Sequence, residues 1–313
     1  MRKPLGVIMD PIEGINPKKD TTLALLLAAQ QRDWPIFYMQ AKDLFLVNDK
    51  PCARMRSLQV QDDPKNWFEC GKESIHALDS LSVILMRKDP PIDMQYIYAT
   101  QLLDKAEQQG VLIANRPQSL RDFNEKLFTL NFPDCCPPSL VTSNIQTAQE
   151  FLLQHHDIIA KPLDGMGGQS VFRVRDNDPN CNVILETLTH NNQSYMMVQR
   201  YISEVRFGDK RIIMINGEAI PYALARIAAP GETRANLAVG GIGKAVKLSE
   251  RDVWICQQVG PVLKEKGLLL VGLDVIGDYL TEINITSPTG VREIDAQCKL
   301  NIGRQFIDAI FPA

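Results

Sequence analysis

Residues 158–175 read IIAKPLDGMGGQSVFRVR: an apolar run containing Lys161, a glycine-rich turn, and an alternating apolar and polar run. This order predicts a strand, a loop and a second strand. A Walker A loop needs Gly-Lys-Ser or Gly-Lys-Thr before a helix, and a dinucleotide-binding glycine motif also precedes a helix, so both are excluded. The pattern indicates a hairpin flap whose glycines allow backbone N–H groups to close over phosphate oxygens. Lys161 would pair with those phosphates.

A second polar pattern lies in residues 273–287. Asp274 interrupts an apolar run, and Glu282 and Asn284 stand two apart in the next one, so the latter two share one face of a strand. Acids in apolar strands are costly unless they are paired or bind a metal. Two carboxylates and an amide oxygen form a site suited to Mg²⁺ carrying phosphates.

The metal hypothesis has a geometric consequence. A regular two-residue turn at Gly277-Asp278 would pair Asp274 with Thr281 and would put Glu282 on the opposite face. A shared metal therefore predicts a three-residue turn or a β-bulge between these two strands.

Two further stretches predict contacts with a nucleotide. Residues 196–202 read MMVQRYI, a strand that would line a purine pocket and offer backbone hydrogen bonds to its edge; a plain core strand is the alternative. Asn216-Gly217 predicts a hairpin turn. Arg211 and Arg226 lie near opposite ends of that hairpin, so that one edge of the sheet would hold both.

Residues 230–243 form a glycine-rich loop in which Arg234 and Asn236 are embedded. A long loop of this composition is typical of a lid that closes over a substrate. A surface loop without function is the alternative.

The N-terminal third alternates strand and helix patterns. Strands are expected at 5–9, 36–39, 81–86 and 111–114, and helices at 21–31 and 95–109. This alternation predicts a parallel sheet, in which ligands lie beyond the carboxyl ends of the strands. Asp10, Arg87, Asn115 and Arg116 follow three of these strands. Arg87, between a buried strand and Pro90-Pro91, is a candidate for holding an anionic substrate; ordinary loop polarity is the alternative.

A further helix is expected at 119–130, carrying Lys126, and a domain boundary near residue 120. The 313 residues suggest about two domains. With 34 basic and 37 acidic residues, the net charge is −3, and no long block carries one sign. Neither a nucleic-acid nor a membrane partner is expected. No apolar run approaches the roughly 18 residues of a membrane span, so we expect a soluble cytoplasmic protein.

The seven cysteines are irregularly spaced and the four histidines have no companion pattern. We therefore expect reduced thiols, no zinc site and no catalytic triad.

Four motifs together resemble the ATP-grasp superfamily and, within it, the prokaryotic glutathione synthetases. They are VILMRKDPP (83–91), KPLDGMGG (161–168), GETR (231–234) and TEINITSP (281–288). The resemblance covers essentially the whole chain. It implies an α/β N-terminal domain with a parallel sheet, followed by an α+β ATP-grasp fold of two subdomains. The implied ranges are 1–120 for the N-terminal substrate-binding domain, 121–203 for the subdomain with the flap, and 204–313 for the subdomain with the lid and metal site.

The resemblance also implies roles for individual residues. Contacts with ATP are implied for Lys126, Lys161, Gly165, Met166, Gly167, Gly168, Gln199, Arg200, Tyr201, Ile202 and Asp209. Ligation of Mg²⁺ or Mn²⁺ is implied for Asp274, Glu282 and Asn284. Stabilisation of the transferred phosphoryl group is implied for Arg211, Arg226 and Arg234. Contacts with substrate carboxylates are implied for Arg87, Asn284 and Ser287.

The implied activity is the joining of γ-glutamylcysteine to glycine at the expense of ATP, through an acyl phosphate, in a homotetramer. Arg200 departs from the expected small or neutral residue, so its side chain is expected to point away from the nucleotide. One alternative is another ATP-grasp carboxylate–amine ligase, such as a D-alanine–D-alanine or a glutamate-adding ligase. Another is a nucleotide-binding regulator without turnover.

Overall fold

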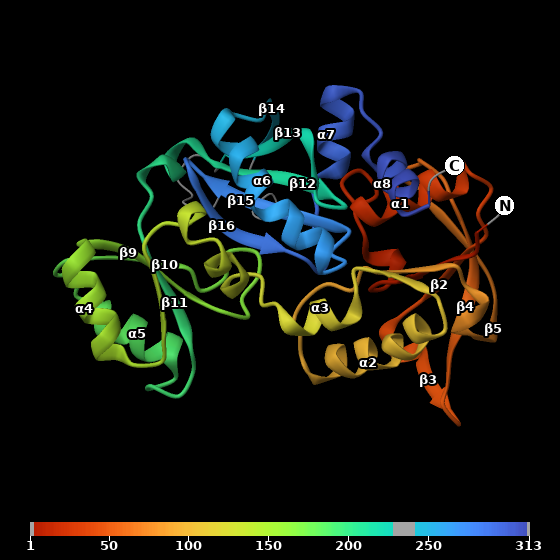
Figure 1. Cartoon of the computed structure of the whole chain (residues 1–313), viewed down its shortest axis with the longest axis horizontal. Coiled ribbons are helices and arrows are strands. Elements are labelled where there is room, and N and C mark those ends of the chain that lie inside the picture. The colour runs from red at the N-terminus through yellow and green to blue at the C-terminus, as the bar shows by residue number, and fades with distance from the viewer. Residues whose placement is uncertain (1–2, 228–241, 312–313) are drawn as a thin grey trace.

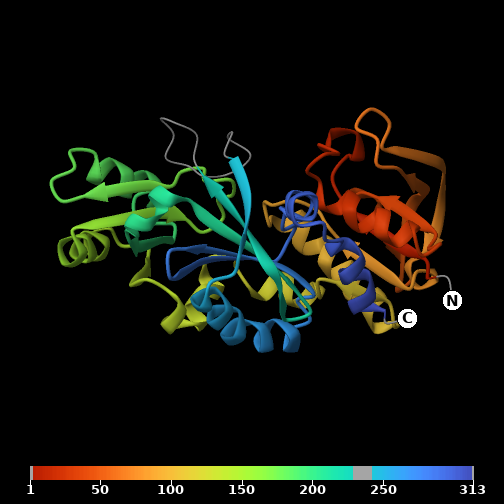
Figure 2. The same ribbon diagram turned by 90° about the horizontal axis from the view of Figure 1, so that it is seen from above.

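The computed structural model describes residues 3–227 and 242–311, which are arranged around three sheets (Figures 1 and 2). The first sheet lies at the right-hand end of the molecule in Figure 1, and the other two sheets make up the rest. Within these two ranges no helix is long and apolar enough to cross a membrane.

The first sheet is mixed, not wholly parallel as predicted. Its parallel strands are β1 (Leu5–Ile8), β2 (Ile36–Met39), β6 (Val83–Met86) and β7 (Leu112–Ala114). The antiparallel strands are β3 (Leu44–Val47), β4 (Lys50–Val60) and β5 (Phe68–Ala77). The four predicted strands are thus confirmed, and the antiparallel extension is an addition. Its outer strand β5 is largely exposed, so its sequence carries little of the apolar pattern by which a strand is recognised.

Helices α1 (Thr21–Gln30) and α2 (Met94–Gln108) pack against strands of this sheet. Two helices from the other end of the chain lie nearby: α7 (Val291–Cys298) contacts mainly the third sheet, described below, and α8 (Ile302–Ile310) adds a layer on α1. The predicted cap of α1 is present, because the Asp20 carboxylate accepts a hydrogen bond from the backbone N–H of Leu23. Helix α8 packs against α1 (Figure 1). Its residues Phe306 and Ile307 are buried in the same apolar core as Leu5.

The second sheet is antiparallel and carries the predicted flap. Its order is β10 (Phe172–Arg175), β9 (Asp157–Pro162), β11 (Met196–Arg200) and β8 (Ser139–Thr142). Helices α4 (Ile145–His155) and α5 (Cys181–Thr189) lie on its outer side (Figure 1). Ala160 pairs with Phe172 across β9 and β10, so the glycine-rich segment between them closes a hairpin, as predicted.

The third sheet contains the predicted bulge. Its order is β14 (Ile242–Lys247), β13 (Glu218–Ile227), β12 (Asp209–Ile215), β15 (Leu270–Ile276) and β16 (Tyr279–Asn284), and α6 (Glu250–Glu265) packs against it. Around the turn Ile276 pairs with Tyr279, but the register shifts after Val275, and Asp274 pairs with Glu282. The two carboxylates therefore occupy the same position across the ladder, which a regular two-residue hairpin would have prevented.

The predicted helix at 119–130 is wrong in its extent. Helix α3 spans Pro117–Asp122, and a separate 3-10 turn begins at Leu127. Between them, the Asn124 side-chain oxygen accepts hydrogen bonds from the backbone N–H groups of Lys126 and Leu127, both at 3.0 Å. An Asn side chain that satisfies the backbone in this way replaces the helical hydrogen bonds and ends the helix.

Candidate active site

A pocket of about 510 Å³ lies between the second and third sheets. The flap borders it on one side, and Asp89, Pro90 and Glu125 close it on the side of the first sheet. With the exception of Arg87, every predicted site residue in the described part of the chain lines this pocket. Arg234 and most of the predicted lid lie outside the described residues.

The third-sheet wall holds Asp274 in a cluster of arginines. Arg211 donates to both carboxylate oxygens, at 2.5 and 2.9 Å, and Arg226 lies 2.9 Å from one of them. Both arginines lie near the end of the β12–β13 hairpin that is opposite its turn, and β12 is paired with β15, the strand that carries Asp274. Burial by itself would raise the pKa of Asp274, but the two guanidinium groups hold it well below its usual range.

Both carboxylate oxygens of Asp209 are bonded to Arg226. The two side chains form a bidentate pair with distances of 2.8 and 2.5 Å. Burial tends to lower the pKa of Arg226, but Asp274 and Asp209 outweigh it and raise that pKa. A ribose contact by Asp209 would have to share oxygens that this arginine already binds.

The lysines are less firmly paired. Lys126 donates to Glu282 Oε1 at 3.0 Å and to the carbonyl oxygen of Gly165, at the base of the flap, at 2.5 Å. Lys161 makes one contact, 3.3 Å long, with the carbonyl oxygen of Thr281. Burial lowers the pKa of Lys161 to about 8, although the nearby Glu282 opposes this shift.

At the far end of the pocket, side chains and backbone groups of residues 199–201 are bonded to neighbouring parts of the protein. The backbone N–H groups of Arg200 and Tyr201 donate to the carbonyl oxygens of Pro138 and Asp157, both at 2.9 Å. Gln199 donates to the hydroxyl of Ser139 at 2.9 Å. Arg200 donates to the hydroxyl of Tyr279 at 3.0 Å, and its Nε has no partner among the described residues. The expectation that Arg200 turns aside from the nucleotide is compatible with this contact.

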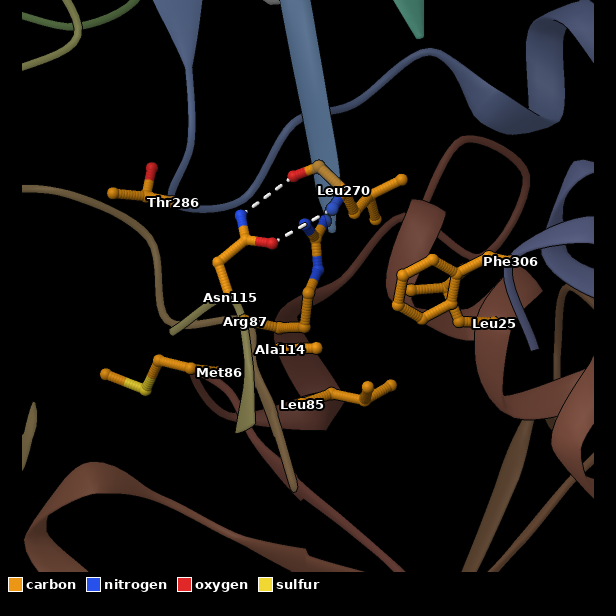
Figure 3. Close-up of a pocket in the computed structure, with 9 residues that line it drawn as sticks. All are labelled: Leu25, Leu85, Met86, Arg87, Ala114, Asn115, Leu270, Thr286 and Phe306. Carbon is orange, nitrogen blue, oxygen red and sulfur yellow. Dashed lines mark hydrogen bonds between the residues drawn. The ribbon is translucent and has the colours of Figure 1, made fainter. Parts of the chain in front are cut away.

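Arg87 lies apart from the main pocket and joins two domains. It is only 6% exposed, and it donates to Thr22 Oγ1 of α1 and to the carbonyl oxygen of Pro288, both at 3.0 Å. Burial lowers its pKa, against the pull of Asp20. With Asn115 it lines a separate cavity of about 10 Å³ (Figure 3), which has room for a single water molecule.

The other polar residues at the strand ends are also engaged with the protein. Asn115 exchanges hydrogen bonds with the backbone of Leu270, at 2.9 Å each (Figure 3), and also donates to the carbonyl oxygen of Ile285. Asp10 pairs with Lys88 at 3.0 Å. Asn115 thus joins the first sheet to β15 and to the segment that follows β16, whereas Asp10 bonds within the loops at the edge of the first sheet.

The sequence analysis missed Asn124 and Glu125, which precede Lys126. Glu125 lines the pocket and accepts three hydrogen bonds from residues 285 and 286. Expecting a continuous helix hid these contacts, because a helix would have pointed the three residues in different directions. The available signal was the run of three polar residues between Phe123 and Leu127.

The arrangement fits a divalent cation held jointly with a polyphosphate. No group of three or more His, Cys, Asp and Glu side chains suited to a metal occurs in the ranges that the structure describes. Asp274 and Glu282 supply two carboxylates, and Asn284 uses its side-chain N–H on Gly272, at 3.1 Å, so its oxygen is directed elsewhere. Hard oxygen ligands of this kind suit Mg²⁺, which commonly binds through one or two carboxylates plus substrate phosphates.

Two facing sheets, a glycine-rich flap and paired cations and carboxylates define the class of ATP-grasp ligases. The fold supports this class: D-cycloserine synthetase DcsG superposes with a TM-score of 0.68 over 98% of each chain, at 12% identity. The ATP-grasp ligase PsnB complexed with a minimal precursor gives 0.66 over 99% of each chain, at 15% identity.

Sequence comparisons define the family more narrowly. The model of the prokaryotic glutathione synthetase N-terminal domain matches residues 4–121, and that of the ATP-grasp domain of the same enzymes matches residues 125–299. Glutathione synthetase of Pseudomonas putida is 58% identical over 306 residues, covering 98% of this chain and 96% of that protein. That of Coxiella burnetii is 53% identical over 307 residues, with the same coverage. The chain belongs to the prokaryotic glutathione synthetase family.

Proposed function

We propose that this protein joins γ-glutamylcysteine to glycine at the expense of ATP, through an acyl-phosphate intermediate. Family membership identifies it as an ATP-dependent ligase that forms glutathione. The observation that carries the proposed route is the cluster of two lysines and two arginines around Asp274 and Glu282. Such a cluster fits a bound polyphosphate and a reaction in which charge moves between oxygens.

ATP would lie across the pocket from the second sheet to the third. Its adenine would lie against residues 199–202 and its ribose near Asp209. The ammonium groups of Lys126 and Lys161 would bind its phosphates beneath the flap, residues 165–168. Arg211 and Arg226 would then turn from Asp274 towards the phosphoryl group being transferred.

Asp274, Glu282 and Asn284 would hold Mg²⁺ or Mn²⁺, which neutralises phosphate charge when bound. Arg211 and Arg226, which pair with Asp274 in this structure, would then pair with the phosphates, and the cation would pair with Asp274. No buried charge would be left without a partner when nucleotide and cation bind together.

The protein's own residues would position and clamp the reactants. An oxygen of the cysteinyl carboxylate attacks the γ-phosphorus of ATP, the bond to the bridging oxygen breaks, and ADP leaves. The uncharged amine of glycine then attacks the acyl carbon, inorganic phosphate leaves, and the surplus amine proton goes to solvent. No protein nucleophile takes part. Arg87, Asn284 and Ser287 remain our candidates for binding substrate carboxylates, although Arg87 lies apart from the main pocket and contacts Pro288. Arg234 remains our candidate for stabilising the transferred phosphoryl group.

The test is ADP release with γ-glutamylcysteine and glycine, each omitted in turn. Release that requires both substrates supports the proposal. Release with D-alanine but none with γ-glutamylcysteine would instead favour a D-alanine ligase, and no release with any amine would favour a nucleotide-binding regulator.

We further propose a homotetramer located in the cytoplasm, with domain limits near residues 120 and 203. Light scattering coupled to size-exclusion chromatography measures the number of subunits. A mass other than that of four chains would contradict the proposed assembly.

A further inference from the structure

Residues 124–126, which we call the connector turn, link three parts of the site. The Asn124 side chain donates to the carbonyl oxygen of Leu163, where β9 enters the flap, at 2.9 Å. Lys126 joins the flap to Glu282, as described above. The backbone carbonyl oxygen of Glu125 accepts from the N–H of Ile283 at 2.9 Å, alongside β16. The turn therefore contacts both walls of the pocket.

The side chain of Glu125 binds backbone groups of the segment that follows β16. Its Oε1 accepts hydrogen bonds from the backbone N–H groups of Ile285 and Thr286, at 2.8 and 3.1 Å, and from the Thr286 hydroxyl at 3.0 Å. Among the described residues no hydrogen bond reaches its other oxygen, and Glu125 borders the pocket. One carboxylate oxygen thus accepts three hydrogen bonds from residues 285 and 286, which belong to a loop and are not paired with any strand.

A buried carboxylate at this place needs an explanation. Burial raises the pKa of Glu125, and the charge of Glu282 adds to that effect, so the site is unfavourable for the ionised carboxylate. The segment it holds begins just after Asn284, a proposed metal ligand, and includes Ser287, a proposed substrate contact. Asn115 and Arg87 fix the carbonyl oxygens of the same segment, at Ile285 and Pro288, but neither reaches its N–H groups.

We propose that Glu125 is a positioning residue of the ligase reaction. It fixes Ile285 and Thr286 by their N–H groups, and thereby sets the side chains on either side, Asn284 and Ser287, against the pocket. This inference rests on the proposed function for its effect on turnover, but the positioning itself is measurable without turnover.

Three variants separate positioning from a general structural effect. Glu125→Ala removes all three acceptor contacts, whereas Glu125→Gln keeps an oxygen that can accept the same donors. Glu150→Gln changes an exposed glutamate on α4 and serves as the matched control. Hydrogen exchange of the amides of Ile285 and Thr286 reports directly on the contacts, while steady-state kinetics and ADP binding report on the consequence.

In Glu125→Ala we expect these two amides to exchange about tenfold faster or more, and kcat to fall about tenfold or more, as loss of hydrogen bonds to a charged acceptor implies. The Kd for ADP should stay within about twofold. Glu125→Gln should restore most of the amide protection and of kcat, and Glu150→Gln should match the parent protein.

Unchanged exchange at Ile285 and Thr286 in Glu125→Ala would overturn the inference. So would a loss of ADP affinity as large as the loss of kcat, or a Glu125→Gln variant no better than Glu125→Ala. If the parent protein itself releases no ADP, the proposed function fails, and the exchange measurement still decides whether Glu125 positions the segment.

Discussion

The two sides of the pocket hold their cations in contrasting ways. On the flap side, Lys161 makes a single long contact and Lys126 pairs with one carboxylate oxygen. On the third-sheet side, Arg211 and Arg226 both bind the buried Asp274. The lysines can turn to an incoming phosphate at little cost, whereas the arginines leave a buried carboxylate unpaired unless a cation takes their place. We therefore expect nucleotide to be recognised first on the flap side, and the arginine side to respond to nucleotide and metal together.

The largest expected effect on stability and on turnover is that of Asp274→Asn, which removes the carboxylate shared by Arg211 and Arg226. Two buried guanidinium groups lose the charge they share, so we expect the free energy of unfolding to fall by about 3–5 kcal/mol. ADP release should fall about 1,000-fold or more, because a proposed metal ligand is also lost. Urea unfolding and ADP release measure the two effects. Asp278→Asn, in the exposed turn of the same hairpin, is the control, and an Asp274→Asn protein as stable as this control would contradict the comparison.

Glu282→Gln should separate chemistry from stability. Glu282 is a quarter exposed, and its one ion-pair partner, Lys126, is buried. Glutamine keeps an oxygen that can accept from Lys126, so we expect a smaller fall in the free energy of unfolding than in Asp274→Asn. Turnover should nevertheless fall about 100-fold or more if Glu282 is the metal ligand that we propose. Near-normal ADP release in a folded Glu282→Gln protein would refute the metal role of this residue.

Removal of divalent metal should affect the two sides unequally. In EDTA we expect ADP to keep measurable binding through the lysines, with a Kd raised about tenfold to 100-fold. Mn²⁺ without nucleotide should bind at least about tenfold more weakly than Mn²⁺ with ADP, since coupling between two ligands is reciprocal. Calorimetry measures both terms. Equal Mn²⁺ affinity with and without ADP would show that the pairing of Asp274 with the arginines does not weaken metal binding.

Lys161 gives the flap side a pH dependence. Its pKa in the free protein is about 8, and a bound phosphate raises it. ADP affinity should therefore be constant below pH 8 and fall as the pH rises above 8, by up to about tenfold per pH unit. Fluorescence titration with ADP from pH 6.5 to 9.5 checks this, and Lys161→Arg should flatten the profile. An unchanged slope in Lys161→Arg would assign the dependence to another group.

The same lysine predicts how stability changes with pH. Its folded pKa lies below the unfolded value of 10.5, so the unfolded chain binds more protons between pH 8 and 10.5. The contribution of Lys161 to the free energy of unfolding should therefore rise with pH across that window. Comparison of parent protein and Lys161→Met by urea unfolding isolates this contribution.

The smallest expected effect is that of Gly167→Ala in the flap. Gly167 has a φ of +64°, and a Cβ there would meet no atom within 4 Å. The cost is therefore confined to the left-handed backbone, about 1–2 kcal/mol. We expect ADP affinity to fall by less than about tenfold, with turnover at saturating ATP unchanged. A larger loss would show that nucleotide binding requires the left-handed backbone at Gly167 more strictly than we expect.

The sequence predicted best where chemistry demanded one geometry. The bulge between β15 and β16 followed from requiring Asp274 and Glu282 to share a face, and the flap followed from glycines between two strand patterns. Contacts between distant segments were not predictable in this way. Arg87 appeared free for a substrate, because nothing in its neighbourhood along the chain shows that Pro288, 201 residues later, binds it. The helix expected at 119–130 failed for a local reason, since apolar spacing does not reveal that Asn124 replaces the helical hydrogen bonds.

Helix α8 has a consequence for how the protein is made. Phe306 and Ile307 complete the apolar core that begins with Leu5, although the chain visits two other sheets in between. Residues 31–301 are synthesised after α1 and before α8, so α1 waits for this partner while two other sheets are being made. A chain stalled or cut before residue 302 leaves exposed the apolar surface that α8 covers on α1, which is the kind of surface that chaperones bind. Completion of this apolar core is therefore a late step in the folding of the N-terminal part.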